Sequence, residues 1–204
     1  MKALSGLALA VAIGAGFASS AGCALTSKAD ALSPRYFSPE PLNAARSAKL
    51  AMVHELRLGE VSAAGHLDDR IAYRIGQSEM GFYDARRWTE NPEAYLRRAL
   101  ERDLFEDRGL SRIVAGDAPI LDVELTAFEE LRGQPARARV SLTFLLRDER
   151  HSYLERTLAL ERVVEQPSGA DAAQCLAQTL SGALDDAVRQ LDDEVVAKLT
   201  AVNR

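Results

Sequence analysis

The sequence predicts an α+β domain in which one largely antiparallel sheet has two helices packed on one of its faces. Three observations favour this fold class: stretches with alternating apolar and polar residues, two stretches with apolar residues at helical spacing, and turn residues between them. The strands fall into two groups, and a helix follows each group, which is typical of an α+β arrangement. We place this domain at residues 34–204.

The first 22 residues have the features of an export signal. Lys2 provides a positive start, and residues 3–18 form an apolar core that is too short for a comfortable membrane span. The small residues that follow, ending in Gly22-Cys23, resemble a bacterial lipobox, which implies that Cys23 is lipidated and becomes the mature N-terminus. Ser20 stands where such sites usually have Leu, so ordinary cleavage near Ala21 and a bare apolar anchor remain alternatives.

The composition indicates a single, mildly acidic domain. Removing residues 1–22 from the 204-residue chain leaves 182 residues, which is enough for one sizeable core. The net charge of −5 becomes −6 without Lys2, so no nucleic-acid partner is expected. If Cys23 is acylated, Cys175 has no partner for a disulfide. We expect Cys175 to be a small residue in or beside the core and not a nucleophile.

The first group of strands precedes residue 88. Tyr36-Phe37, which lies between two prolines, predicts a short strand at a sheet edge. Residues 50–61 predict a second strand with a bulge near Gly59. Residues 65–70 form a turn, and the alternation over 71–76 predicts a half-buried strand.

The first helix is well marked at both ends. Asn91 is a favoured N-cap, and Pro92 suits the first helical position. Gly109 can adopt the left-handed conformation that ends a helix, with Leu110 packing back on the last turn. One apolar stripe is expected to face the core: Leu96, Ala99, Leu100 and Leu104.

Aromatic residues lie just before this helix. Trp88, the only tryptophan, precedes the cap, and Tyr83 lies upstream. One interpretation is that Trp88 closes the core over the start of the helix. The other is that Trp88 and Tyr83 are partly exposed and dock a partner, because Trp and Tyr are enriched at binding hot spots. We therefore name Tyr83 and Trp88 as candidate docking residues.

The second group of strands is a predicted three-stranded meander over residues 121–127, 138–146 and 154–164. Residues 129–135 are predicted to form a loop. In this register Asp122 and Glu124 are expected to face Arg137 and Arg139 across the strands, as marks of register and not as a site.

A long helix closes the chain after Asp171, a plausible cap. Its acidic doublets are expected on a solvated face, and its last turns are expected to project beyond the sheet. Its apolar stripe has helical spacing throughout: Leu176, Leu180, Leu184, Val188, Leu191, Val195, Leu199 and Val202.

No motif predicts catalysis. His54, His66 and His151 are isolated, and no His, Cys and carboxylate residues have metal-ligand spacing. We therefore expect no catalytic residue, no metal and no cofactor beyond the lipid on Cys23. A weaker hypothesis, an envelope enzyme, would use His66 or His151 with nearby acids.

The order of features resembles the ABC-type transport auxiliary lipoproteins over residues 35–199. The most specific feature is a Trp followed shortly by Glu and Pro at the start of the first helix. The other features, in order, are the lipobox, the strand Arg35-Tyr36-Phe37-Ser38-Pro39, the turn at 65–70 leading into 71–74, the segment 83–92, the helix at 96–105 and the strand at 121–128.

The resemblance implies a periplasm-facing lipoprotein of the outer membrane that is not an enzyme. It implies partnership with an MCE-domain protein, a permease and an ATPase that move lipids between the inner and outer membranes. Self-association is a further expectation. The alternative function, from another class, is a free-standing periplasmic carrier that binds lipid between the helices and the sheet.

Overall fold

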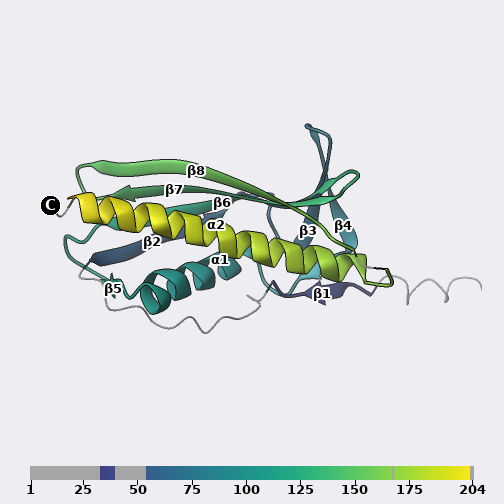
Figure 1. Ribbon diagram of the computed structural model, residues 1–204, viewed down its shortest axis with the longest axis horizontal. Helices are drawn as coiled ribbons and strands as arrows, with labels where there is room; N and C mark the ends of the chain where they lie inside the picture. The colour runs from purple at the N-terminus through teal and green to yellow at the C-terminus, as the bar shows by residue number, and fades with distance from the viewer. Residues whose placement is uncertain (1–32, 40–53, 167, 203–204) are drawn as a thin grey trace, which may run out of the picture. The chain divides into compact units, whose positions relative to one another are not determined.

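The computed structural model describes residues 33–39, 54–166 and 168–202. Pro34–Arg204 forms one compact unit, in which a single sheet carries both helices on one face (Figure 1). The longest strand pairings are antiparallel, so the predicted fold class is confirmed. No helix in the described ranges has the length and apolar character needed to cross a membrane.

Strand β6 (Ile120–Arg132) is the centre of the sheet because it pairs with three other strands. On one edge it pairs antiparallel with β7 (Arg137–Arg147), which in turn pairs antiparallel with β8 (Ser152–Val163). These strands are the predicted meander. All apolar residues of β7 at the predicted core positions are buried: Ala138, Val140, Leu142, Phe144 and Leu146.

Two strands share the other edge of β6. Strand β2 (Glu55–Ala63) runs parallel to its first half, and β3 (Arg70–Ile75) runs parallel to its last residues. The short β5 (Ser111–Arg112) pairs with β2. Strand β4 (Glu79–Trp88) pairs antiparallel with β3, and β1 (Arg35–Phe37) pairs with β4 at the sheet edge, as expected for the short N-terminal strand.

The predicted bulge in β2 is present. The register between β2 and β6 shifts between Leu58 and Val61, and the Oδ1 of Asp122 accepts a hydrogen bond from the backbone N–H of Glu60 at 2.8 Å. A Cβ atom at Gly59 would collide with the Asp122 carboxylate. The absence of a side chain at Gly59 therefore lets the bulged strand approach β6.

Helix α1 (Pro92–Glu101) begins at the predicted cap, although the Asn91 side chain makes no capping hydrogen bond. It continues as one turn of π-helix, η2 (Arg102–Asp107), which the sequence pattern did not predict. Gly109 has a φ of 71°, so the predicted left-handed stop is confirmed. The apolar stripe and the residue that packs back on it are all buried: Leu96, Ala99, Leu100, Leu104 and Leu110.

Helix α2 (Ala172–Val202) lies across β7 and β8 and also contacts α1 (Figure 1). Asp171 caps it, since its Oδ1 accepts the backbone N–H groups of Ala173 and Gln174 at 2.9 and 3.2 Å. The predicted stripe is buried as far as Leu199, so the expectation that the last turns project beyond the sheet is wrong up to that residue. The side chain of Val202 is outside the described set.

Two other details of the sequence-based prediction are wrong. Residues 129–132 belong to β6 and not to a loop, because their backbone pairs with both β3 and β7. This longer strand moves the register, so Arg139 lies opposite Glu129, and Asp122 pairs instead with Arg147 at 2.8 Å. Arg137 pairs with Glu161 of β8.

The two carboxylates of the acidic doublet Asp192-Asp193, near the end of α2, have different environments. Asp193 is exposed, whereas the side chain of Asp192 is fully buried and lies 2.6 Å from the Nε atom of Arg108. Arg108 follows η2, so the π turn brings a cation against this face of α2. Asp192 lies four residues after the buried Val188 and three before the buried Val195, so the helix period places it on the buried face, where it meets Arg108.

Candidate partner-docking surface

Strand β4 carries both candidate docking residues, and the structure places them in different environments. The side chain of Trp88 is 1% exposed, and its ring lies 5.0 Å from that of Phe128 and 6.4 Å from that of Tyr95. Trp88 therefore closes the core at the start of α1, and its indole contributes no surface for docking. Tyr83, five residues earlier, is half-buried and lies beside Tyr73.

Tyr83 is the centre of a group of aromatic and arginine side chains, which we call the Tyr83 cluster: Tyr73, Tyr83, Arg86, Glu130 and Arg132. The rings of Tyr73 and Tyr83 are 5.0 Å apart. The guanidinium carbon of Arg132 lies 3.4 Å from the Tyr73 ring centre and 4.8 Å from that of Tyr83. The guanidinium of Arg86 lies 4.1 Å from the Tyr83 ring centre. Cation–π contacts thus join side chains from three strands.

The backbone makes room for this cluster at Gly81. Gly81 lies directly opposite Tyr73 in the antiparallel pairing of β3 and β4. A Cβ atom at Gly81 would lie 2.5 Å from the far end of the Tyr73 ring. The missing side chain therefore allows Tyr73 to lie over β4 and contact Tyr83.

A hydrogen bond orients the Tyr83 phenol. The Tyr83 hydroxyl donates to the Glu130 carboxylate, and the Nε atom of Arg132 lies 3.4 Å from the same hydroxyl. Burial, together with the hydrogen bond to Glu130, raises the pKa of Tyr83. The phenol therefore stays a donor at neutral pH, and Glu130 holds the ring in one orientation.

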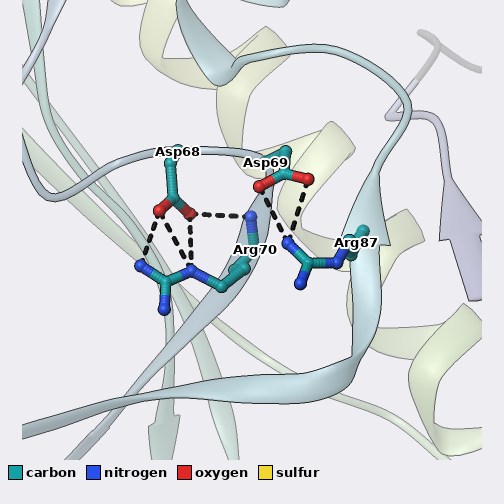
Figure 2. Close-up of polar contacts among 4 residues, drawn as sticks. All are labelled: Asp68, Asp69, Arg70 and Arg87. Carbon is teal, nitrogen blue, oxygen red and sulfur yellow. Dashed lines mark hydrogen bonds and ion pairs between the residues drawn. The ribbon is translucent and has the colours of Figure 1, made fainter. Parts of the chain in front are cut away.

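Two ion pairs stabilise the start of β3 and the end of β4 (Figure 2). The Arg70 side chain binds Asp68 through contacts of 2.6 and 3.0 Å to one carboxylate oxygen. The Nη1 atom of Arg87 binds both oxygens of Asp69 at 2.9 and 3.0 Å. The side-chain hydrogen bond from Arg70 lowers the pKa of Asp68. The Asp68–Arg70 pair thus joins the turn to the start of β3, and the Asp69–Arg87 pair joins it to the end of β4.

The residues of these ion pairs also contact the neighbour of Tyr83 and the core. The guanidinium of Arg70 lies 4.1 Å from the ring centre of Phe82, the neighbour of Tyr83. The backbone N–H of Trp88 donates to the carbonyl of Asp69 at 2.6 Å. The turn containing Asp68 and Asp69 is therefore a structural support for β4, and its acids are occupied by arginines.

The histidines are separated in space as well as in sequence. His54 lies 3.2 Å from Thr200, His66 is half-buried in the turn before β3, and His151 is exposed near Asp148 at 3.6 Å. The described ranges contain no group of His, Cys, Asp and Glu side chains that could hold a metal ion. Cys175 is half-buried on α2, and Cys23 lies outside the described residues.

Sequence reasoning found Tyr83 but missed its neighbours. Arg132 and Glu130 were assigned to a loop, and Arg86 had no feature that distinguished it from other arginines. The alternation over 71–76 did place Tyr73 in a strand. A longer β6 was signalled by Phe128 and Leu131, which extend the apolar pattern past residue 127 once the bulge near Thr126 is allowed.

Comparison with known proteins gives one family match. The model of the ABC-type transport auxiliary lipoprotein component matches residues 37–191, which includes the whole Tyr83 cluster and both helix starts. None of the curated proteins gives a significant match.

Solved structures share the fold. Protein XCC0632 from Xanthomonas campestris has a TM-score of 0.68 at 18% identity, covering 83% of this chain and 99% of its own. An uncharacterized protein has a TM-score of 0.63 at 15% identity, covering 80% of this chain and 99% of its own. The hypothetical protein CT253 from Chlamydia trachomatis reaches 0.50 at 10% identity, covering 72% and 98%. At these identities the likeness concerns the fold alone.

Proposed function

The chain belongs to the family of ABC-type transport auxiliary lipoprotein components, and from this premise we propose that it is a non-enzymatic accessory subunit of an MCE-type ABC lipid transport system. In this proposal the domain faces the periplasm and docks on the MCE-domain protein or the permease. The lipid on Cys23 holds the domain at the outer membrane, where the domain assists the transport of lipids between the two membranes.

The observation that carries the docking role is the Tyr83 cluster. It combines Tyr and Arg, the residue types enriched at the energetic centres of protein interfaces. Its members come from three paired strands, so their backbone is held rigidly before a partner arrives. Ile75, which lies opposite Arg132 in the pairing of β3 and β6, is 41% exposed and adds apolar area.

The sequence of the first 23 residues supports the envelope location. An export signal followed by Gly22-Cys23 matches the processing of a bacterial lipoprotein, and two or more acyl chains give firm membrane attachment. Ala24, in place of Asp, favours the outer membrane where the enterobacterial sorting rule applies.

The experiment that tests this function is purification of the full-length protein from its own membranes in mild detergent. Mass spectrometry then identifies the proteins and lipids that remain bound. Recovery of an MCE-domain protein or its permease in stoichiometric amount is the expected result. Recovery of a stoichiometric lipid without a protein would favour the free-standing carrier, and recovery of neither from folded protein would contradict both functions.

A further inference from the structure

Two arginines of the Tyr83 cluster contact aromatic rings and form no salt bridge within the described part of the chain. Arg86 and Arg132 stack on the Tyr83 ring, with guanidinium carbons 4.1 and 4.8 Å from its centre. Neither forms a salt bridge with a carboxylate in residues 33–39, 54–166 or 168–202. Arginines nearby behave differently, since Arg70 and Arg87 are each bound to an aspartate.

Stacking leaves the hydrogen-bonding edge of a guanidinium available. A guanidinium presents its N–H donors in the plane of the group, and contact with an aromatic face occupies only the perpendicular direction. The side chain of Arg86 is half-buried and that of Arg132 is exposed, so solvent reaches both. Through their common ring, the two carbons lie at most about 9 Å apart, the sum of the two distances.

The acid in the cluster, Glu130, is already engaged. Its carboxylate accepts a hydrogen bond from the Tyr83 hydroxyl, which orients the ring that both arginines contact, and it also interacts electrostatically with Arg132. Gly81 leaves space for Tyr73, which supports Arg132 from another side at 3.4 Å. The arginines are thus held in position before binding, which lowers the entropic cost of an ionic contact.

We propose that Arg86 and Arg132 bind a carboxylate-bearing segment of the protein partner, so that the docking partner presents Asp or Glu to the Tyr83 cluster. This inference rests on the proposed function, since it specifies the chemistry of the surface that docks there. Carboxylates suit the site because guanidinium groups bind them in a bidentate, planar geometry.

The charge around the cluster favours a protein carboxylate over a membrane surface. Adsorption to anionic lipid depends on a cluster of several uncompensated basic residues. Here Glu79 and Asp84 lie on β4 and Glu130 lies on β6, so the surrounding strands have little net positive charge. Lys198 is the only lysine in the described part of the chain. A short-range contact with one or two carboxylates does not require a wide positive field.

The first test compares two double variants of the full-length protein, purified from its own membranes as above. Arg86→Gln with Arg132→Gln removes the two charges from the cluster. Arg97→Gln with Arg150→Gln removes two charges from exposed arginines elsewhere. The amount of MCE-domain protein or permease recovered per mole of purified variant is expected to fall about tenfold or more in the first variant and to stay unchanged in the second.

A second test identifies the acidic group directly. In the variant Arg86→Lys, a carbodiimide should join the new amine to the partner's carboxylate as an amide, with loss of water taken up by the carbodiimide. Peptide mass spectrometry then gives the Asp or Glu involved. The same treatment of Arg150→Lys is the control and is expected to give no crosslink to the partner.

The outcomes separate the two proposals. If the wild-type protein recovers no transporter component, the proposed function fails and the inference fails with it. If the wild type recovers the partner and the cluster variant recovers it equally, only the inference fails. The inference is also overturned if the cluster variant keeps its partner but loses bound phosphatidylglycerol in the same mass spectra, because the arginines would then bind a headgroup phosphate.

Discussion

The charge of Asp192 is strongly altered by its surroundings. Its side chain is fully buried, Arg108 approaches it at 2.6 Å, and the buried Asp103 lies close enough to oppose its ionisation. Burial is the main cause that raises its pKa to about 7, from the usual 3.8. Arg108 also binds the exposed Asp193, so one cation serves two acids.

This burial predicts a pH dependence of stability. Between about pH 4 and 7 the folded protein holds a proton on Asp192 that the unfolded chain releases, so stability due to this group falls as pH rises. The free energy of unfolding of Asp192→Asn, relative to that of the wild type, should therefore rise by about 3 kcal/mol between pH 4.5 and 8. Urea unfolding at several pH values measures it. Asp193→Asn is the control, and an equal pH trend in that variant would refute the assignment.

Substitution of Trp88 is expected to lower stability, whereas substitution of Tyr83 is expected to weaken partner binding. Trp88→Ala should lower the free energy of unfolding by about 3–5 kcal/mol, because a buried aromatic ring is removed from the core. Tyr83→Ala should cost less stability, since Tyr83 is half-buried, but should reduce recovery of the transporter partner. Chemical denaturation and the membrane purification measure the two effects. Loss of partner binding by a still-folded Trp88→Phe variant, with Tyr83→Ala unaffected, would reverse these roles.

At the scale of elements, the periodicity of the sequence predicted those features that arise when a strand or helix buries one of its faces. The stripes of α1 and α2, the alternation of β7, the bulge in β2 and the stop at Gly109 all follow from local sequence and were confirmed. Pairing between distant strands was not predictable in this way. Glu129 is fully buried in β6 because Arg74 and Arg139 bind it at 2.9 and 2.5 Å.

The Tyr83 cluster was also predictable only in part, because the pairing of distant strands brings its members together. Tyr83 is recognisable as an aromatic residue beside a helix start, but Arg132 joins it only because β6 runs alongside β3. The π turn at η2, after which Arg108 contacts Asp192, likewise has no signature in the apolar spacing. Such contacts depend on tertiary register, which one sequence does not reveal.

Gly81 gives a prediction at this scale. In Gly81→Ala the new methyl group takes the space of the Tyr73 ring end, so Tyr73 must swing away from Tyr83 and Arg132. Stability should change by at most about 1 kcal/mol, because Ala in a strand offsets part of the cost. Partner recovery should fall. Gly65→Ala, which has open space around it, is the control, and unchanged partner binding in Gly81→Ala would show that Tyr73 is not needed.

At the scale of the whole molecule, stability and attachment have separate sources. The continuous core between the sheet and the helices holds the domain together, and many of the surface ion pairs, such as Arg98–Glu90, are exposed and contribute little. The charge of the whole chain is −5, which favours no general attraction to anionic membranes. In the proposed function, attachment therefore depends on the lipid on Cys23, a residue outside the described ranges.

Cys23→Ala should accordingly move the protein from the membrane fraction to the soluble fraction without lowering its thermal unfolding temperature. The N-terminal peptide of the wild type should begin at Cys23 and carry the mass of a diacylglycerol and an acyl chain. Cys175→Ser is the matched control, because it changes the only other cysteine. It should leave the mass of the N-terminal peptide and the membrane location of the protein unchanged. An unmodified wild-type N-terminus created by cleavage near Ala21, or Cys23→Ala remaining with the membranes, would contradict the lipid anchor. Because the proposed anchor and the proposed docking residues are far apart in the sequence, released Cys23→Ala should still bind solubilised partner with the affinity of the wild type.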